Sequence, residues 1–504
     1  MKRVVNASTK IFCVNLRSTN MKKIVSFLLL IGILFGVTAC KKNKLFTGND
    51  ARLTFSADTL TFDTIFTTIG STTAFIKVYN PYDQRLKISN IQLASGAASV
   101  FYLNVDGMQG SSFTDLELAP KDSIYIFLSC KPNASLQNQP LLISENILFS
   151  CNGNRQQVTV QAYGQDAYFH KYDEIQTTLW KNDKPHVLLG SCLVDTNQTL
   201  TIQAGTKVYC HPGAYLLVSG TLKSKGTKTD SILFRGDRLE HYYDELPGQW
   251  GGIVFLRNCA SGSILEHTTL KNATTAVILG STSNATSAAA FQFSSAPDVT
   301  IKKCRIYNCD QNGIFTFLSI LHVENTLIYN CNKECVALLF GGISDFKYCT
   351  IANYSNGEIQ HEDPCLRISN YAIFNGTGIL SQVDATFNNC IIIGNISNKG
   401  DTYANNYEVF IDHDLGFSAT APFNYTFDHC LLQLEPTLID MTHVISCTTN
   451  PNLNTVFSDK DNDNFALEAG SPAINTGSTS LTSIVDDLND KTRDALPDMG
   501  CLEY

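Results

Sequence analysis

The sequence predicts an all-β protein in which a solenoid of stacked parallel β-coils follows a small β-sandwich. Three observations support this prediction. Charged residues make up only 16% and hydrophobic residues 44% of the 504 residues, a balance that suits long buried β-ladders. Short runs of alternating apolar and polar residues fill 51–166, as in a sandwich. A similar segment then recurs about every 22 residues, which is typical of a solenoid.

The chain opens with an export signal. Met21-Lys22-Lys23 precedes the apolar run 24–37, the arrangement of a secretory signal. The run has about 14 residues, which is too short for a permanent membrane span. We therefore interpret 21–39 as a signal peptide and 1–20, which precede this complete signal, as an upstream start-codon artefact.

The end of this signal, Val37-Thr38-Ala39-Cys40, resembles the bacterial lipobox. The resemblance implies that Cys40 is lipidated and becomes the mature N-terminus, with 40–50 as a lipidated tether to a membrane. The alternative is an ordinary signal with an incidental cysteine. Because Lys41 is not the Asp that resembles an inner-membrane retention signal, we expect a cell-envelope protein on the outer membrane. Whether it faces the periplasm or the cell surface stays open.

Charge limits the partners of the mature protein. Residues 1–39 hold six basic residues and no acidic one, so the remainder has 31 basic and 46 acidic residues. Such a surface repels phosphate backbones, and we expect no nucleic-acid partner. The expected partners are the membrane, through the lipid anchor, and either a polysaccharide or another envelope protein.

Residues 51–166 read as about seven short strands separated by turn signals such as Asn80-Pro81 and Asn152-Gly153. The stretch DTIFTTIGSTTAFIKVYNP resembles the immunoglobulin-like domains that precede β-helices in exported bacterial lipoproteins. This resemblance implies a spacer or docking module. Cys130 and Cys151 end two expected strands, and the sequence leaves open whether they form a disulfide or are two buried thiols.

Six segments define the repeat, at 265–273, 301–309, 323–331, 346–354, 387–395 and 427–433. Equivalent residues of successive coils stack about 4.8 Å apart, because each coil buries the next. The alignment predicts an inward ladder of small side chains and a second ladder of asparagines at a sharp bend. The inward ladder consists of Thr268, Cys304, Thr326, Cys349, Cys390 and Cys430, and the bend ladder of Asn272, Asn308, Asn330 and Asn353. A metal or redox site is the alternative for the cysteines, but no His or acid recurs in phase with them.

The segment 190–237, with Thr199-Leu200-Thr201-Ile202 and Ala204-Gly205-Thr206, resembles the first turns of pectin-lyase-like proteins. The resemblance implies a right-handed parallel β-helix over 180–447. The motifs SPAINTG and PDMGCLEY in 448–504 resemble the closing module of secreted β-helix proteins, and we expect this module to cover the last coil. The fold itself hosts enzymes, adhesins and spacers, so it leaves the function open.

Few polar residues are candidates for chemistry. The catalytic candidates are Asp412, His413, Asp414, Asp428, His429 and Lys347. Strict alternation in FDHC places Asp428 inward with Cys430 and turns His429 to solvent, while the facing of Lys347 stays open. Solvated polar side chains are the alternative for all six.

A calcium loop is the other chemical possibility. Asp459, Asp461 and Asp463 occupy alternate positions, as at the start of such a loop. Asn464 replaces the expected glycine, however, and Gly470 the terminal glutamate. Calcium is therefore the one cofactor that the sequence leaves open, with a polar turn as the alternative.

Two functions remain. We favour a membrane-anchored envelope lipoprotein that serves as a non-catalytic, glycan- or partner-binding scaffold. The alternative is a polysaccharide-degrading enzyme, a lyase or a hydrolase. Its groove would be walled by the insertions at 274–298, 355–365 and 396–424.

Overall fold

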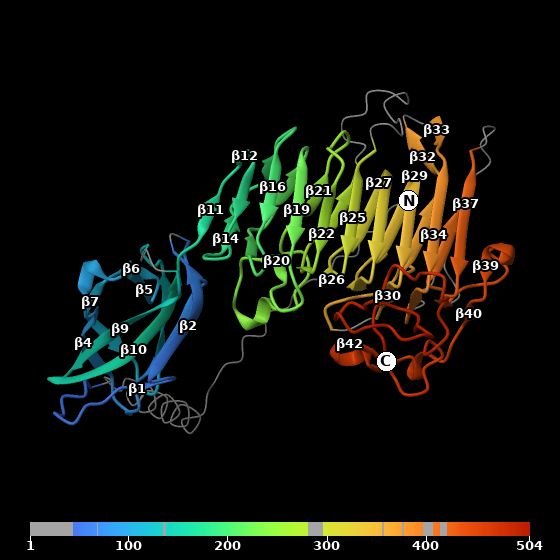
Figure 1. Cartoon of the computed structure of the whole chain (residues 1–504). Helices are drawn as coiled ribbons and strands as arrows, with labels where there is room; N and C mark the ends of the chain where they lie inside the picture. The colour runs from blue at the N-terminus through green and yellow to red at the C-terminus, as the bar shows by residue number, and fades with distance from the viewer. Residues whose placement is uncertain are drawn as a thin grey trace, which may run out of the picture. The chain divides into compact units, whose positions relative to one another are not determined.

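The computed structural model describes residues 44–67, 69–134, 138–280, 296–354, 357–374, 377–396, 407–413 and 421–504 (Figure 1). It divides into two compact units. The first comprises residues up to 61, 71–130 and 144–161, and the second comprises 62–70, 131–143 and 162–504. The prediction of an all-β fold with a sandwich followed by a parallel β-helix is confirmed. Cys40 lies outside the described residues.

Two five-stranded antiparallel sheets form the sandwich. The first contains, in spatial order, β1 (Thr54–Phe55), β3 (Ala74–Tyr79), β8 (Ser123–Cys130), β5 (Phe101–Val105) and β6 (Met108–Gly110). The second contains β2 (Thr59–Phe66), β10 (Asn154–Gln165), β9 (Leu141–Cys151), β4 (Leu86–Leu93) and β7 (Ser112–Leu118). The rings of Phe55 and Phe149 meet between the sheets, with centroids 4.8 Å apart. Cys130 and Cys151 are both buried and both free thiols.

The β-helix is built from parallel strands that stack coil upon coil (Figure 1). An 11-stranded sheet forms one side of the coils, with β11 (Tyr168–His170), β14 (His186–Leu188), β17 (Lys207–Cys210), β20 (Ile232–Gly236), β23 (Thr268–Lys271), β26 (Arg305–Cys309), β28 (Leu327–Cys331), β30 (Thr350–Asn353), β35 (Ile391–Gly394), β38 (Leu431–Leu432) and β40 (Thr448–Thr449). Cys309 pairs with Cys331 in this sheet, so one coil here takes 22 residues.

A 17-stranded sheet forms the rest of each coil as two parallel stacks. The first stack has β12 (Glu174–Ile175), β15 (Cys192–Val194), β18 (Tyr215–Val218), β21 (Gly252–Phe255), β24 (Val277–Leu279), β31 (Leu366–Ser369) and β36 (Val409–Asp412). The second has β13 (Thr178–Trp180), β16 (Thr199–Ile202), β19 (Thr221–Lys225), β22 (Ser263–Glu266), β25 (Asp298–Lys302), β34 (Val383–Asn388), β37 (Phe423–Asp428) and β39 (Val444–Ile445). The long strands β27 (Ile314–Glu324) and β29 (Val336–Lys347) run through both stacks.

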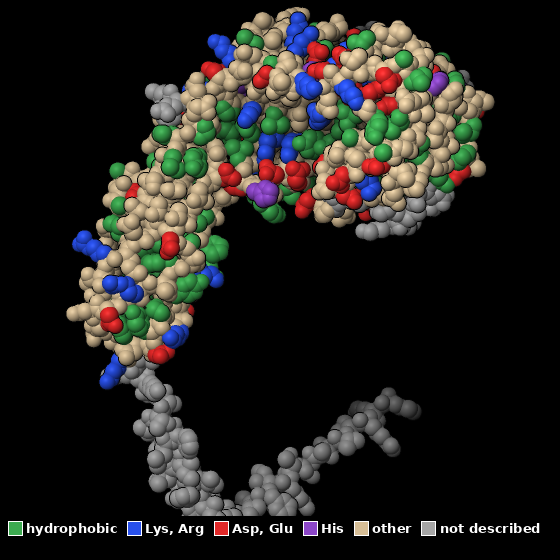
Figure 2. Space-filling view, turned by 60° about the horizontal axis from the view of Figure 1, so that its bottom comes forward, with side chains coloured by type: hydrophobic (Ala, Val, Ile, Leu, Met, Phe, Trp, Pro, Cys, Tyr) green, Lys and Arg blue, Asp and Glu red, His purple; other side chains and the backbone are tan. Residues whose placement is uncertain are grey.

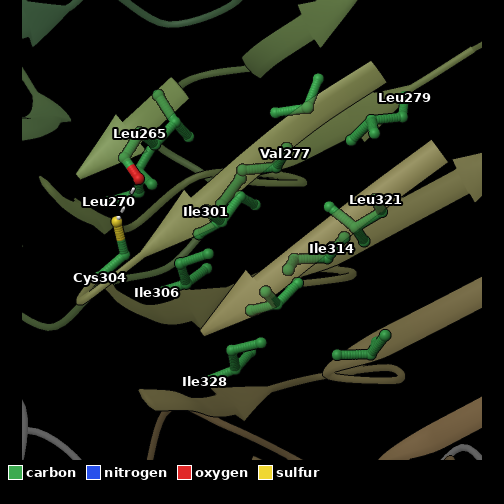
Figure 3. Packing of buried hydrophobic residues seen from close by; sticks show 14 of the residues in the cluster. Leu265, Leu270, Val277, Leu279, Ile301, Cys304, Ile306, Ile314, Leu321 and Ile328 are labelled. Carbon is green, nitrogen blue, oxygen red and sulfur yellow. Dashed lines mark hydrogen bonds between the residues drawn. The ribbon is translucent and has the colours of Figure 1, made fainter. Parts of the chain in front are cut away.

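Like residues pile on like in the interior, as Figure 3 shows for the central coils. Leu270, Ile306 and Ile328 lie in register on three successive strands and are fully buried. Farther along, the rings of Phe346, Phe387 and Phe427 stack with centroids 4.8 and 5.0 Å apart. Each such side chain contributes roughly 1.5–3 kcal/mol through burial, so the stability of a coil depends on the coil next to it.

The structure places the six residues of the small-side-chain ladder inside the β-helix, at most 1% exposed. Along its second half, a backbone N–H of one coil faces the sulfur of the next: Cys349 N to Cys390 Sγ at 3.5 Å, and Cys390 N to Cys430 Sγ at 3.4 Å. The row extends to two residues that the sequence alignment missed. Ser224 bonds to Thr268 through the hydroxyls at 2.9 Å, and Cys447 Sγ accepts from Cys430 N.

The asparagine positions differ from one another. Asn272, Asn308 and Asn330 have the left-handed backbone conformation, with φ of 62°, 54° and 52°. Asn353 does not; its side chain instead pairs with the backbone N–H and C=O of Cys331, at 2.8 Å each. A second left-handed row precedes the inward ladder, at His267, Lys303, Asn325, Tyr348, Asn389 and His429.

The C-terminal module packs on the outer face of the 11-stranded sheet, and its closing of the last coil stays a prediction. It contains β41 (Phe457–Asp459), β42 (Asn464–Leu467) and the short 3-10 helices η6 (Leu453–Thr455) and η7 (Lys460–Asn462). Phe457, Phe465 and Met499 pack on Tyr329 and Ile391, which point outward from the 11-stranded sheet. The reason is that this outer face is apolar and needs cover.

The remaining elements are the hairpin β32 (Tyr371–Phe374) and β33 (Thr377–Leu380) and the 3-10 helices η1 (Gly96–Ala98), η2 (His241–Tyr243) and η5 (Met441–His443). In the part of the chain that the structure describes, no helix is long and apolar enough to cross a membrane.

Candidate functional site

The candidates Asp428 and His429 show that strict alternation was the wrong rule at the bend. His429 is in the left-handed conformation, with φ of 50°. Two residues therefore separate the inward side chains of Phe427 and Cys430, and Asp428 is not inward. Both polar side chains are about one-third exposed, at 29% and 32%, and pair with each other at 2.7 Å.

Lys347 belongs to a polar row on the outward face of β27 and β29. Its ammonium lies 2.5 Å from Asp345 Oδ2, and Asp345 Oδ1 pairs with His322 Nδ1. The hydrogen bond to Asp345 raises the pKa of His322 above its usual value. Although burial works against it, the hydrogen bonds from His322 and Lys347 lower the pKa of Asp345. All three groups are engaged with one another, which is a stabilising arrangement rather than a base ready for substrate.

Asp412 lies in a different cluster, at the end of β36. Its carboxylate accepts from Arg367 at 2.9 Å and from the Tyr371 hydroxyl at 2.7 Å. Burial and this hydrogen bond raise the pKa of Tyr371 to about 12. The His413 ring packs against Phe423, with centroids 5.2 Å apart. Asp414 lies outside the described residues, so the three predicted neighbours are not seen as one group.

A buried network that the sequence did not predict joins two insertions. His361 Nε2 lies 2.8 and 2.9 Å from the oxygens of Glu408, and both side chains are fully buried. The backbone N–H groups of Cys365 and Ile396 also donate to this carboxylate, each at 3.0 Å. The insertions at 355–365 and 396–424 therefore each contribute a side chain to the interior rather than only groove walls.

His361, Glu408 and Cys365 offer three ligand atoms within 4.8 Å of one another, but their hydrogen bonds do not suit a metal. Asn353 is fixed by its pairing with Cys331, so its Nδ2 group donates to His361 Nδ1 at 2.7 Å. His361 Nδ1 must then carry the lone pair and Nε2 the proton, which donates to Glu408. A metal would need the lone pair on Nε2. We interpret the network as a hydrogen-bonded tie between coils.

The calcium candidates do not converge. Asp459 accepts from Asn462 at 2.9 Å, and Asp461 pairs with Lys460 at 3.1 Å. Asp463 accepts instead from Asn330, on the 11-stranded sheet, at 2.9 Å. Each carboxylate has a different partner, so the three do not form the oxygen cage that calcium requires.

The more promising site lies on the outer face of the 11-stranded sheet, between the loop around η2 and the C-terminal module, where Lys271 is buried and Arg235, Arg305 and Tyr307 are partly exposed. Figure 2 shows a hollow in this unit in which Lys and Arg side chains lie beside hydrophobic ones, with acidic side chains along the rim. The outward residues of β20, β23 and β26 supply basic and aromatic side chains: Arg235, Lys271, Arg305 and Tyr307. We call this set the sheet groove.

Ion pairs and hydrogen bonds hold the floor of the sheet groove in place. Arg235 pairs with Asp244 at 3.0 Å and Lys271 with Glu245 at 3.2 Å, both from the loop around η2. On the other side, Arg305 donates to Asn489 of the C-terminal module at 2.7 Å. The loop and the module therefore act as two walls.

One carboxylate stands on each wall. Asn308 donates to Glu245 at 2.5 Å and Asn330, one coil later, donates to Asp463. Burial raises the pKa of Asp463 against the hydrogen bond from Asn330, and the charge of Glu245 raises it further. The ring of Tyr307 stacks on that of Tyr329, with centroids 4.7 Å apart, and burial raises the pKa of Tyr307.

The repeat did not predict this site, because its recurring small residues mark the inward positions, whereas the groove residues face outward. Lys271 and Tyr307 each stand immediately before an asparagine of the bend ladder, and their strands pair in register. This outward position, read along the repeats, could have pointed to the groove.

No protein-family model and no curated protein matches the chain. Among solved structures, a PapD-like domain of human CEP192 covers 24% of this chain and 89% of its own, with 10% identity and a TM-score of 0.16. The catalytic domain of a GH87 α-1,3-glucanase covers 79% of this chain and 92% of its own, with 8% identity and a TM-score of 0.19. Likeness at this level carries no argument about function.

Proposed function

We propose that this protein is an outer-membrane lipoprotein whose β-helix binds a polysaccharide in the sheet groove without cleaving it. The observation that carries the proposal is the groove floor, where Lys271, Arg305 and Tyr307 are held side by side between two walls. Aromatic and cationic side chains in fixed positions suit a chain of sugar rings bearing hydroxyl or carboxylate groups.

The state of the acids favours binding over cleavage. A glycoside hydrolase needs one protonated carboxyl and one carboxylate facing the scissile bond. The two carboxylate oxygens of Glu245 instead accept hydrogen bonds, one from Lys271 and the other from Asn308. The His322 imidazole is likewise occupied by Asp345.

The test uses the chain from Lys41 to Tyr504 and a panel of acidic and neutral polysaccharides. We expect retardation in gels containing at least one of them, with no unsaturated products and no new reducing ends. Lys271→Gln should weaken binding about tenfold, as expected for one charge-assisted contact. The matched control Lys333→Gln, an exposed lysine on another part of the β-helix, should have no effect. Equal retardation of all three proteins would contradict the groove.

The enzyme remains a second candidate because of Asp463. Its raised pKa suits a general acid, and its interaction with Glu245 suits a carboxylate pair. If the wild type releases reducing ends and both Asp463→Asn and Glu245→Gln abolish the release, the protein is a hydrolase. If either variant releases reducing ends as fast as the wild type does, this carboxylate pair is not the catalyst.

The anchor is tested separately. Labelling cells with a fatty-acid analogue should mark the wild type, and the Cys40→Ser variant should stay unlabelled and leave the membrane fraction. An unlabelled wild type would refute the lipid anchor.

A further inference from the structure

The sandwich carries a hollow that neither the groove nor the anchor uses. It has a volume of about 570 Å³ and lies over the first sheet, between β3 and β6. Its lining includes Tyr102, Asn104, Gln109, Phe127 and Ser129. None of the lining side chains is charged. Aromatic rings beside amides and hydroxyls form the usual composition of a site for a neutral polar ligand.

A straight row of side chains crosses the sheet at this hollow. Phe75 pairs in register with Phe127, Phe127 with Asn104, and Asn104 with Gln109. Because neighbouring strands lie about 4.8 Å apart, the row is about 14 Å long. It presents two rings followed by two amides, across four strands.

The aromatic half of the row forms an exposed platform together with Tyr125, which lies two residues before Phe127 on β8. Phe75, Tyr125 and Phe127 are 50%, 40% and 39% exposed. Tyr125 and Phe127 lie nearly parallel, at an interplanar angle of 12° with centroids 5.8 Å apart. Large exposed apolar surfaces of this kind mark binding sites in soluble domains.

The amide half has an unsatisfied group. Asn104 Oδ1 is buried and accepts no hydrogen bond, although buried polar atoms in proteins nearly always have a partner. It lines the hollow directly beside Phe127. A hydroxyl donor in the hollow would satisfy this oxygen after the amide turns about its Cβ–Cγ bond to present it.

We propose that this platform is a second glycan site, which binds a neutral pyranose polysaccharide. A sugar ring stacks its C–H face on Phe127, which lines the hollow, beside Tyr125, whose ring is contacted by the Lys77 ammonium at 4.6 Å. The hydroxyls of the next ring bond to Asn104 and Gln109. A peptide that adds a strand to β6 would run along the sheet edge, whereas this row crosses the sheet. The site does not depend on the sheet groove, because all of its residues belong to the sandwich.

The experiment is affinity gel electrophoresis of the chain from Lys41 to Tyr504. The gels contain β-glucan, α-glucan, mannan, xylan or galactan, with alginate and polygalacturonate as acidic comparisons. We expect at least one neutral polysaccharide to retard the wild type. Phe127→Ala and Asn104→Ala should each weaken that binding about tenfold. The matched control Tyr163→Ala removes a 40% exposed tyrosine from the second sheet and should bind as the wild type does.

Each outcome decides the proposal. Loss in Phe127→Ala and Asn104→Ala, with Lys271→Gln unchanged, assigns neutral binding to the sandwich. Loss in Lys271→Gln alone assigns it to the sheet groove and overturns this inference while sparing the proposed function. No retardation of the wild type by any neutral polysaccharide also overturns it. Circular dichroism and thermal melting of each variant exclude unfolding as the cause of a loss.

Discussion

Arg493 is the residue that we expect to hold the C-terminal module on the β-helix. Its guanidinium pairs with Glu503 at 3.0 Å, where both side chains are less than 5% exposed. It also donates to Asn325 Oδ1 of the left-handed row at 2.8 Å and lies 3.8 Å from the centre of the Tyr348 ring. Arg493→Ala removes all of these contacts.

The expected loss of stability follows from the buried Glu503 carboxylate, which Arg493→Ala leaves without its ion-pair partner. Breaking a buried ion pair costs about 3–5 kcal/mol. Glu503 keeps backbone donors at Asp494 and Asp498, at 3.1 and 3.2 Å, so its desolvation is partly offset. Because both partners lie within the C-terminal module, we expect the folded module to lose about 3 kcal/mol relative to its unfolded state, which raises its open, unfolded population about a hundredfold.

Limited proteolysis measures this population, because cleavage of a transiently open segment follows its equilibrium opening. The fragment that ends near residue 448 should appear about a hundred times faster in the variant. Lys460→Ala is the control, since Lys460 pairs with an 83% exposed Asp461 and should cost at most about 1 kcal/mol. A change below threefold in Arg493→Ala would refute the role of this ion pair.

Three further predictions concern the β-helix. Burial and the charge of His170 lower the pKa of His186 to about 4. Because this pKa is below the unfolded value of about 6.5, the folded protein should lose up to about 3 kcal/mol of stability as the pH falls from 6.5 to 4. Urea titrations at several pH values measure this loss. The same titrations of His186→Gln should show a smaller pH dependence, and a wild type without any would contradict the burial argument. Cys390→Thr should change thermal stability little, since threonine already occupies two rungs of that ladder, whereas Cys390→Leu should cost about 1–3 kcal/mol through overpacking. Among the described cysteines, iodoacetamide should label Cys447 first in the native protein. Cys447 is the one of them that is not buried, and a hydrogen bond from Cys430 lowers its pKa. Mass spectrometry measures the labelling, and equal labelling of all thiols would show that the coils open readily.

The sequence predicted those features of the fold that packing inside the β-helix requires. Stacked coils leave room only for small side chains at one position, so Cys304, Cys349 and Cys390 recur there and reveal the period. The left-handed row was not predicted because its residue types vary, as His267, Lys303 and Tyr348 show. That row carries no shared side-chain chemistry, only a shared backbone angle.

The site was harder to predict than the fold. Lys271 and Tyr307 occupy equivalent positions of two repeats. The partners of Lys271 and Arg305, however, are Glu245 from a loop and Asn489 from the C-terminal module. Only tertiary structure brings such distant segments together. The same holds for His361 and Glu408, whose separation of 47 residues gives no pattern to read.

Because of the stacked thiols, the lifetime of the native protein depends on how fast the coils open and not only on the free energy of unfolding. While the coils are closed, burial raises the pKa of Cys349, Cys390 and Cys430 and keeps them inert. Once a stretch of coils separates in an oxidising medium, neighbouring sulfurs become available together and can cross-link in wrong pairs before the chain closes again. Denaturation in air should therefore be irreversible, and lifetime should be set by how often the coils come apart.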